Sequence, residues 1–316
     1  MKLSIRNRLL LSYTAMIILA GVIFGIGFNS LVRMNKRVNR IADSTAHKIQ
    51  VGARLNKDML TVANASKDIM MTDDAAEKQQ YMRLIEETRA QMEEREATIL
   101  DYLTEEGDAQ YRVFEKSWDR YLEALDQINS LALENSNVKA RKISMNESAE
   151  AFDKADASLQ NIIAGMNSTR AIQAFAILND MHSVEKNIIM ESSAERMKTL
   201  EEQMNGFEEE MDELIERMRR SRNSSVMNDF IQNYQDYDRY SDQVMELTMK
   251  NSNNRAFDLA KGEARGHLDQ ASEAMRVLVN MNDQQLEDDK LESTTNYEQA
   301  VSLMTLSGVL AIIIAV

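Results

Sequence analysis

An internal repeat constrains what this chain can fold into more than any other feature of its sequence. Residues 108–164 and 228–280 each carry an aromatic-rich segment that runs into the tripeptide Asn-Ser-Asn, at a constant offset of 116 residues. A repeat on this scale indicates two copies of one supersecondary unit, so the fold must contain this unit twice. The matched positions are Phe114 with Phe230, Trp118 with Tyr234, Tyr121 with Tyr237, Ile128 with Val244, Leu131 with Leu247, and the tripeptides 135–137 with 251–253.

The composition and the apolar spacing indicate that both copies are helical. The 316 residues include no Pro, no Cys and 10 Gly, whereas an ordinary soluble chain contains about 5% Pro. Because Pro breaks helix interiors, its absence favours long uninterrupted helices. Apolar residues also alternate at spacings of three and four, as from Met197 to Met218, which is typical of helices packed at shallow angles. The sequence therefore predicts an all-α protein.

Two uncharged apolar segments bracket the long acidic middle of the chain. Residues 9–29 match the roughly 20 residues that cross a bilayer and exceed the usual core of a cleaved signal peptide, which is the alternative. The basic residues in 1–8 predict a cytoplasmic leader, so that residues 30–300 lie outside the cytoplasm. Residues 301–316 are interpreted as the truncated start of a second transmembrane helix.

Clusters of turn and cap residues divide the middle into six predicted helices. Because the chain must return to the membrane face that it left, the number of reversals is odd, and both Asn-Ser-Asn tripeptides are expected to be bends. The prediction is a six-helix bimodular rod of two stacked four-helix bundles that share two long helices, flanked by transmembrane helices. The proximal bundle takes about 30–134 plus 254–300, and the distal bundle about 135–253. The expected turns lie near 72–74, 105–108, 165–168, 191–193 and 221–224.

Three segments resemble known bacterial sensor modules. Residues 55–58 and the hairpin at 69–74 resemble the first helix of four-helix-bundle sensors, and residues 188–194 are similar at the second hairpin. The doubled arrangement resembles the helical bimodular sensor domain of methyl-accepting chemotaxis proteins. That resemblance implies a homodimeric receptor of the bacterial inner membrane, with its sensor domain in the periplasm. It would bind a small solute, such as an organic acid or amino acid, between helices and pass the signal to cytoplasmic modules missing from this fragment.

Other functions stay open at this point. The outer domain of a transmembrane histidine kinase shares the same arrangement, and a membrane-anchored helical adaptor that binds a partner protein fits the composition as well. The net charge of −14 argues against a nucleic-acid partner. Metal-protease, phosphate-loop and nucleophile-elbow motifs do not occur, so we expect neither an enzyme nor a cofactor or metal.

Charged residues at apolar helix positions are the candidate ligand-binding residues of the proximal bundle. Aligning residues 75–103 with 194–220 at an offset of 115 places Arg89 at the position of Met204. A charge at such a position needs a partner, so Arg89 either snorkels, pairs with an acid, or anchors an anionic ligand. Lys48 has the same alternatives. In the family, arginines in the last turns of the first helix tend to bind carboxylates, and here the nearest cation is Lys67.

The distal bundle has its own candidates. Arg170 and His182, with Tyr234 and Tyr237, either frame a pocket or belong to the core, since aromatic residues at helical spacing are commonly core residues. Arg255 follows the second Asn-Ser-Asn tripeptide, where a bend opens space between helices.

Overall fold

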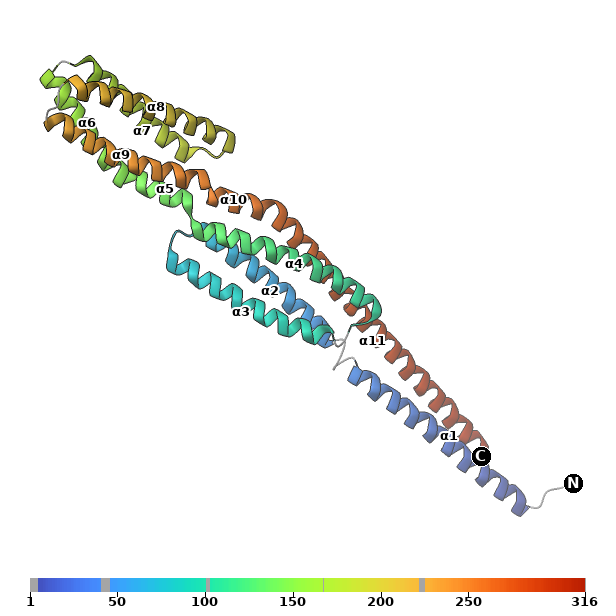
Figure 1. Ribbon diagram of the computed structural model, residues 1–316. Coiled ribbons are helices and arrows are strands. Elements are labelled where there is room, and N and C mark those ends of the chain that lie inside the picture. Colours follow the sequence, from blue (N-terminus) through green and yellow to red (C-terminus); the bar gives the residue numbers. More distant parts are fainter. Residues whose placement is uncertain (1–4, 41–45, 101–102, 167, 222–224, 316) are drawn as a thin grey trace. The chain divides into compact units, whose positions relative to one another are not determined.

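A computed structural model of the chain is almost entirely helical over the residues that it describes, with no strand among them (Figure 1). The predicted all-α class is therefore confirmed. Two compact units are present, unit 1 and unit 2, and each is described by itself. Unit 1 comprises residues 1–63, 86–119 and 267–316, and unit 2 comprises 64–85 and 120–266. The described residues are 5–40, 46–100, 103–166, 168–221 and 225–315.

The helices follow one another with short connections. Unit 1 contains α1, residues 46–63 of α2, 86–100 of α3, 105–119 of α4 and nearly all of α11. Helices α5 to α10 lie in unit 2. The bounds are α1 Ile5–Arg40, α2 Ala46–Met71, α3 Ala75–Leu100, α4 Glu105–Glu134, α5 Ser136–Met145, α6 Glu147–Met166, α7 Thr169–Met190, α8 Ala194–Ser221, α9 Ser225–Lys250, α10 Ser252–Leu259, the π-helical turn η2 Ala260–Ala264, and α11 Arg265–Ala315.

Two of the predicted turns are confirmed by capping geometry. The turn at 72–74 joins α2 to α3, and the Asp74 carboxylate accepts hydrogen bonds from the backbone N–H groups of Ala76 and Glu77. The turn at 191–193 joins α7 to α8, and its Glu191 carboxylate accepts from two backbone N–H groups. The Asp74 carboxylate satisfies N–H groups in the first turn of α3, which lack partners within the helix, whereas Glu191 satisfies N–H groups of the turn itself, before α8 begins at Ala194. The predicted turns at 165–168 and 221–224 include residues outside the described part.

Both Asn-Ser-Asn tripeptides are bends of one residue. Asn135 has φ 52° and ψ 41°, and Asn251 has φ 49° and ψ 37°, so each occupies the left-handed region that Asn tolerates better than most residues. The next helix begins at the following residue, and the chain continues without reversing (Figure 1). A further interruption at Asn146 and the π-helical turn η2 were not predicted.

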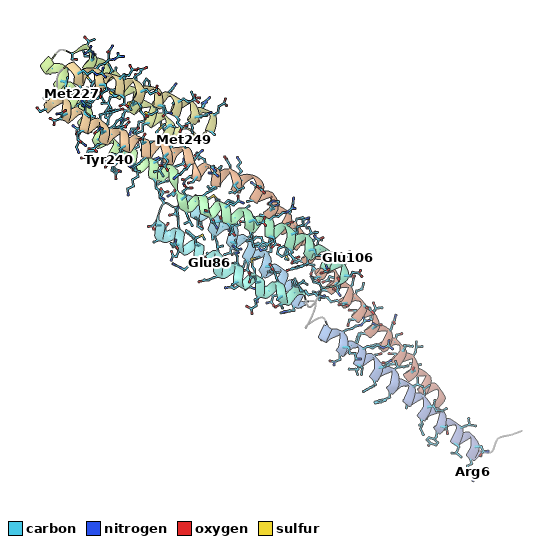
Figure 2. The ribbon with its side chains drawn as sticks, viewed as in Figure 1. Arg6, Glu86, Glu106, Met227, Tyr240 and Met249 are labelled. Carbon is cyan, nitrogen blue, oxygen red and sulfur yellow. The ribbon has the colours of Figure 1, made fainter. Side chains whose placement is uncertain are left out.

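A bundle formed by α5 to α9, here called the second bundle, holds a continuous apolar core in unit 2. Helices α5 and α6 act together as one side of it, and α7, α8 and α9 form the others (Figure 1). The abundant Met residues serve as core: Met204 and Met211 of α8 are fully buried, and Met227 of α9 belongs to the same cluster (Figure 2).

The burial pattern aligns α3 with α8 in a register that differs by one helical turn from the predicted alignment. The buried residues of α8 lie at an offset of 119 from those of α3, and not of 115. The hairpins fix this register, because α2 and α7 end at Met71 and Met190, also 119 apart. Arg89 is therefore not the counterpart of buried Met204. The pairs are Lys78 with Met197, Ile85 with Met204, Met92 with Met211, and Ile99 with Met218.

One helical segment of the described chain is long and apolar enough to cross a membrane, by length and composition. It spans Tyr13–Val38 of α1, with a mean hydropathy of 2.2 in its most apolar window. The predicted first span, 9–29, overlaps this segment. Membrane crossing, its orientation and the second span at 301–316 stay predictions.

Candidate functional site

The structure separates the predicted site residues by burial. Lys67, Arg170 and Arg255 lie exposed on their helices, and Arg89 is partly buried. Lys48, Tyr234 and Tyr237 are buried, whereas His182 is half-buried. These residues are distributed over several helices of both units.

His182 and Tyr237 lie together in an aromatic cluster inside the second bundle. The His182 ring of α7 stacks on the Phe152 ring of α6, with centroids 4.0 Å apart and an interplanar angle of 21°. Tyr237 of α9 presents its edge to Phe152 at 5.8 Å and lies 6.4 Å from His182. Tyr234 instead places its hydroxyl 3.4 Å from the Asp238 carboxylate, outside this cluster. Two predicted residues therefore share one part of the core.

Next to this cluster lies a fully buried carboxylate that the sequence analysis missed. Glu185 of α7 accepts hydrogen bonds from the hydroxyls of Ser144 and Ser148, the latter over 2.6 Å. Lys186 places its ammonium 3.1 Å from the same carboxylate and 2.8 Å from the Ser144 carbonyl oxygen. Because Ser144 and Ser148 flank the interruption at Asn146, this break lets two successive helices direct hydroxyls at one acid.

A sequence signal for Glu185 was present. Glu185 lies four residues after Met181 and three before Ile188, which are both core positions of α7. It also lies five residues before the end of α7, as Ser66 does in α2. Ser66 is buried too, and its hydroxyl donates to the Asn129 side-chain oxygen over 2.8 Å. Both repeats therefore place a polar residue in the core at this level.

Several polar atoms of the second bundle are buried without a hydrogen-bond partner among the described residues. They are His182 Nδ1 and the Thr248 hydroxyl, together with the Tyr237 and Ser241 hydroxyls, which lie near each other without the geometry of a hydrogen bond. Tyr237, Ser241 and Thr248 lie on the core-facing side of α9. A buried polar group without a partner costs roughly 1–3 kcal/mol. Such groups fit a site that a small solute or ordered water completes.

Burial also fixes the charge states around this cluster. It lowers the pKa of His182, and the nearby Lys186 charge lowers it further, so the imidazole is neutral at neutral pH. Burial raises the pKa of Tyr237, so its hydroxyl keeps its proton. The cluster therefore presents one carboxylate, one ammonium and several neutral donors and acceptors, and we call these residues the polar cluster: Ser144, Ser148, His182, Glu185, Lys186, Tyr237 and Ser241.

Lys48 has a different environment in unit 1. Burial lowers the pKa of the Lys48 ammonium, and the Asp289 charge on α11 opposes that shift. Both side chains are buried. Asp289 is therefore the acidic neighbour that the pairing alternative required for Lys48. A ligand role for Lys48 stays a prediction.

The family model for the four-helix-bundle sensory module for signal transduction matches the chain twice, over residues 2–176 and 172–297. The chain belongs to this family. The suspected sensor-module relationship is thereby confirmed, and the two matches agree with the internal repeat. Comparisons with curated proteins and with solved structures found no match. Because the chain is a sensory module, the polar cluster inside its second bundle is the candidate ligand site.

Carboxylates gather between α8 and α9 of this sensory module. Burial, with the charges of Asp238, Asp242 and Asp212, raises the pKa of Glu208 to about 7. Burial and the charges of Asp242 and Asp212 raise the pKa of Asp238 to about 6. These groups do not form a metal site among the described residues. The raised pKa values predict that the contact between α8 and α9 is sensitive to pH.

Proposed function

We propose that the chain is the extracytoplasmic ligand-sensing region of a bacterial chemoreceptor, which transmits the binding of a small solute across the membrane. The observation that carries the proposal is the set of unpartnered polar atoms in the polar cluster of a tandem sensory module. The long apolar segment Tyr13–Val38 supports a membrane anchor. The sensor domain would then lie in the periplasm, as part of a homodimer with cytoplasmic signalling modules.

The chemistry of the polar cluster favours a zwitterionic solute over a simple organic acid. Glu185 would repel a carboxylate, although it would attract an ammonium group. Lys186 and the Tyr237 hydroxyl would in turn bind a carboxylate. A free amino acid carries both charges on one small molecule. Neutral His182 Nδ1 and the Ser241 hydroxyl supply further hydrogen bonds to such a ligand.

Signal transmission would follow from a shift between two helix arrangements. A solute among α6, α7 and α9 shifts an equilibrium only by the difference in its affinity for the two states. Helix α9 continues through α10 and η2 into α11, which carries the predicted second span. The π-helical turn η2 is a place where helix register changes, and such turns are frequent at functional sites. A displacement of α9 would therefore reach the membrane along one continuous chain segment.

A thermal-shift screen of the 316-residue chain in detergent micelles tests the proposal. The screen covers amino acids, organic acids and purines. A ligand at 100 times its dissociation constant stabilises a fold by about 2.7 kcal/mol, which a melting curve resolves. We expect an amino acid to raise the melting temperature. If no solute of these classes raises it, direct solute sensing is wrong and a protein partner becomes the better hypothesis.

A further inference from the structure

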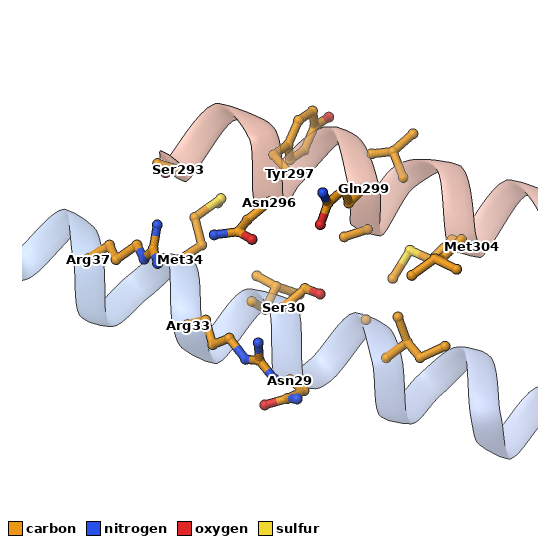
Figure 3. Close-up of a pocket in the computed structure, with 16 residues that line it drawn as sticks. Asn29, Ser30, Arg33, Met34, Arg37, Ser293, Asn296, Tyr297, Gln299 and Met304 are labelled. Atoms are coloured by element: carbon orange, nitrogen blue, oxygen red, sulfur yellow. The ribbon is translucent and has the colours of Figure 1, made fainter. Parts of the chain in front are cut away.

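A cavity between α1 and α11, here called the α1–α11 groove, has chemically different ends. It measures about 520 Å³ and is lined by some of the residues between Ile26 and Arg37 of α1 and between Ser293 and Met304 of α11. In Figure 3, Arg37 reaches from α1 toward α11 near Ser293 and Asn296, while Met304 lies over α1 at the opposite end. Because the two helices run antiparallel here, both contribute polar residues to one end and apolar residues to the other.

The polar end contains the Arg37 guanidinium, and only one of its two terminal nitrogens has a hydrogen-bond partner among the described residues. One terminal nitrogen of Arg37, Nη2, pairs with the Glu292 carboxylate of α11. The other, Nη1, is buried and has no hydrogen-bond partner among the described residues. A buried donor on a charged group costs more when unpaired than a neutral one. Arg33 adds a second guanidinium, and Asn296 a side-chain amide, to the lining of the same end.

The apolar end is narrow because Gly27 lets the two helices approach closely. A Cβ atom at Gly27 would clash with the terminal methyl carbon of Met304. Val301 and Leu303 line the groove beside this contact and are 42% and 49% exposed. These apolar surfaces continue directly from the polar end, so one ligand with both kinds of surface would cover them together.

The two ends are ordered as the layers of a membrane are, and here the argument rests on the proposed membrane location. If residues 9–29 span the bilayer, the Cα atoms of Arg33 and Arg37 lie roughly 6 and 12 Å beyond the end of the span, at a rise of about 1.5 Å per residue. The Arg37 side chain extends back along α1 toward Met34, which brings its guanidinium closer to the span than its Cα atom (Figure 3). The headgroup layer extends about 5–8 Å on each side of the hydrocarbon core. Met304 and Gly27 then lie toward the hydrocarbon.

We propose that the α1–α11 groove binds one anionic phospholipid. Its phosphate accepts a hydrogen bond from Arg37 Nη1, since a planar guanidinium matches phosphate geometry. One acyl chain lies along Val301, Leu303 and Met304. The net negative charge of the headgroup favours an anionic lipid over a zwitterionic one near Arg33 and Arg37. The lipid would occupy the space between α1 and α11 and so set their spacing.

Native mass spectrometry of the 316-residue chain, released from bilayers that contain phosphatidylcholine and phosphatidylglycerol, tests this proposal. We expect one phosphatidylglycerol retained per chain. Arg37→Gln removes the unpaired donor and lowers the affinity about tenfold or more, as expected for a lost hydrogen bond to a charged group. The matched control is Lys36→Gln, because Lys36 is exposed on the same helix and does not line the groove. Lys36→Gln is expected to retain the lipid.

Two further arms separate the possible occupants. Gly27→Leu fills the apolar end without changing charge, so it also displaces the lipid if the acyl chain lies there. Addition of inorganic phosphate leaves the bound lipid in place if the acyl chain contributes to binding. Equal lipid loss in Arg37→Gln and Lys36→Gln would mean general charge attraction and would overturn the proposal. So would a cysteine crosslink between Gly27→Cys of one copy and Met304→Cys of another, which would place a second copy's helix in the groove.

The failure of this proposal is distinguishable from failure of the proposed function. A chain that floats with vesicles but retains no lipid contradicts only the lipid site. A chain that does not associate with vesicles contradicts the membrane anchor and the lipid site together. Helical content by circular dichroism identifies variants that do not fold, and Gly27→Leu then replaces Arg37→Gln as the decisive variant.

Discussion

The backbone N–H of Ser136 donates to the Ser252 hydroxyl over 2.9 Å, and the backbone N–H of Ser252 donates to the Ser136 hydroxyl over 3.0 Å. Asn137 and Asn253 repeat this exchange through their side-chain oxygens, over 3.2 and 3.1 Å. The two tripeptides, 135–137 and 251–253, therefore exchange equivalent hydrogen bonds across a sequence separation of 116 residues. We call this arrangement the Asn-Ser-Asn clasp. It explains why both repeats carry the same polar break, because each supplies hydrogen bonds that the other lacks.

Removing either hydroxyl of the clasp is expected to destabilise unit 2. Ser136→Ala leaves the buried N–H of Ser252 without its acceptor, at a cost of about 1–3 kcal/mol, and Ser252→Ala has the reciprocal effect. The double variant should cost less than the sum of the two, because the residues share one network. Chemical denaturation measures these free energies. Ser183→Ala is the control, since its exposed hydroxyl donates within α7. A single clasp variant that costs no more than Ser183→Ala would contradict the clasp, whereas additive costs in the double variant would mean that its two Ser hydrogen bonds form independently.

Lys78→Met is expected to destabilise the protein, although Met occupies the equivalent position in the second repeat. The Lys78 ammonium donates to the Ala132 carbonyl oxygen over 2.5 Å. That carbonyl would ordinarily accept from the N–H of Ser136, which the clasp diverts. The substitution leaves a buried carbonyl unpaired, at about 1–3 kcal/mol. Thermal unfolding measures the loss, with exposed Lys57→Met as the control, and an unchanged or higher melting temperature would refute the compensating role.

Glu185→Ala is expected to cost about 2–3 kcal/mol of unfolding free energy. The substitution leaves Lys186 without its charge partner and the hydroxyls of Ser144 and Ser148 without their acceptor. Breaking a fully buried ion pair costs about 3–5 kcal/mol, and the partial exposure of Lys186 lowers that figure. Glu185→Gln keeps a hydrogen-bond acceptor and should cost less. Asp180→Ala, on the exposed side of α7, serves as the reference, and equal effects of Asp180→Ala and Glu185→Ala would contradict the burial of Glu185.

Acid conditions are expected to stabilise the contact between α8 and α9. The pKa values of Glu208 and Asp238, about 7 and about 6, are raised above those of an unfolded chain. Folding then favours the protonated forms, so this stabilisation is complete below about pH 4 and is lost as the pH rises through 6 and 7.

The variant Glu208→Gln isolates this effect. It should raise the melting temperature at pH 8 by about 2–4 °C, which corresponds to about 1 kcal/mol for a domain of this size, and should have little effect at pH 4. Glu209→Gln, an exposed neighbour, should change neither value. A Glu208→Gln melting curve that shifts equally at both pH values would show that proton binding at Glu208 does not affect stability.

The helical class and the repeat were predictable because apolar periodicity is a property of the sequence itself. Seven-residue spacing, however, allows a shift by one helical turn, which is why α3 and α8 were aligned at 115 and not at 119. The hairpins at Thr72 and Glu191 carried the information that removes this ambiguity. The left-handed Asn residues were recognisable as breaks, whereas the interruption at Asn146 has no Pro or Gly to mark it.

The candidate site was predictable only in part. His182 and Tyr237 were recognised, because aromatic and titratable residues at core spacing are unusual enough to single out. Glu185 was missed because its residue type does not distinguish it among the 51 acidic residues of the chain. Its burial depends on hydroxyls from α5 and α6, which lie some 40 residues earlier and converge only in the folded bundle.

The measurement that tests the account most directly compares ligand-induced thermal shifts in two Tyr→Phe variants. Tyr237→Phe removes an unpartnered hydroxyl from the polar cluster, whereas Tyr121→Phe makes the same change at the matching position of the first repeat. With the amino acid that stabilises the unmodified chain, we expect Tyr237→Phe to lose most of the shift and Tyr121→Phe to retain it. A full shift in Tyr237→Phe would contradict a solute site in the second bundle.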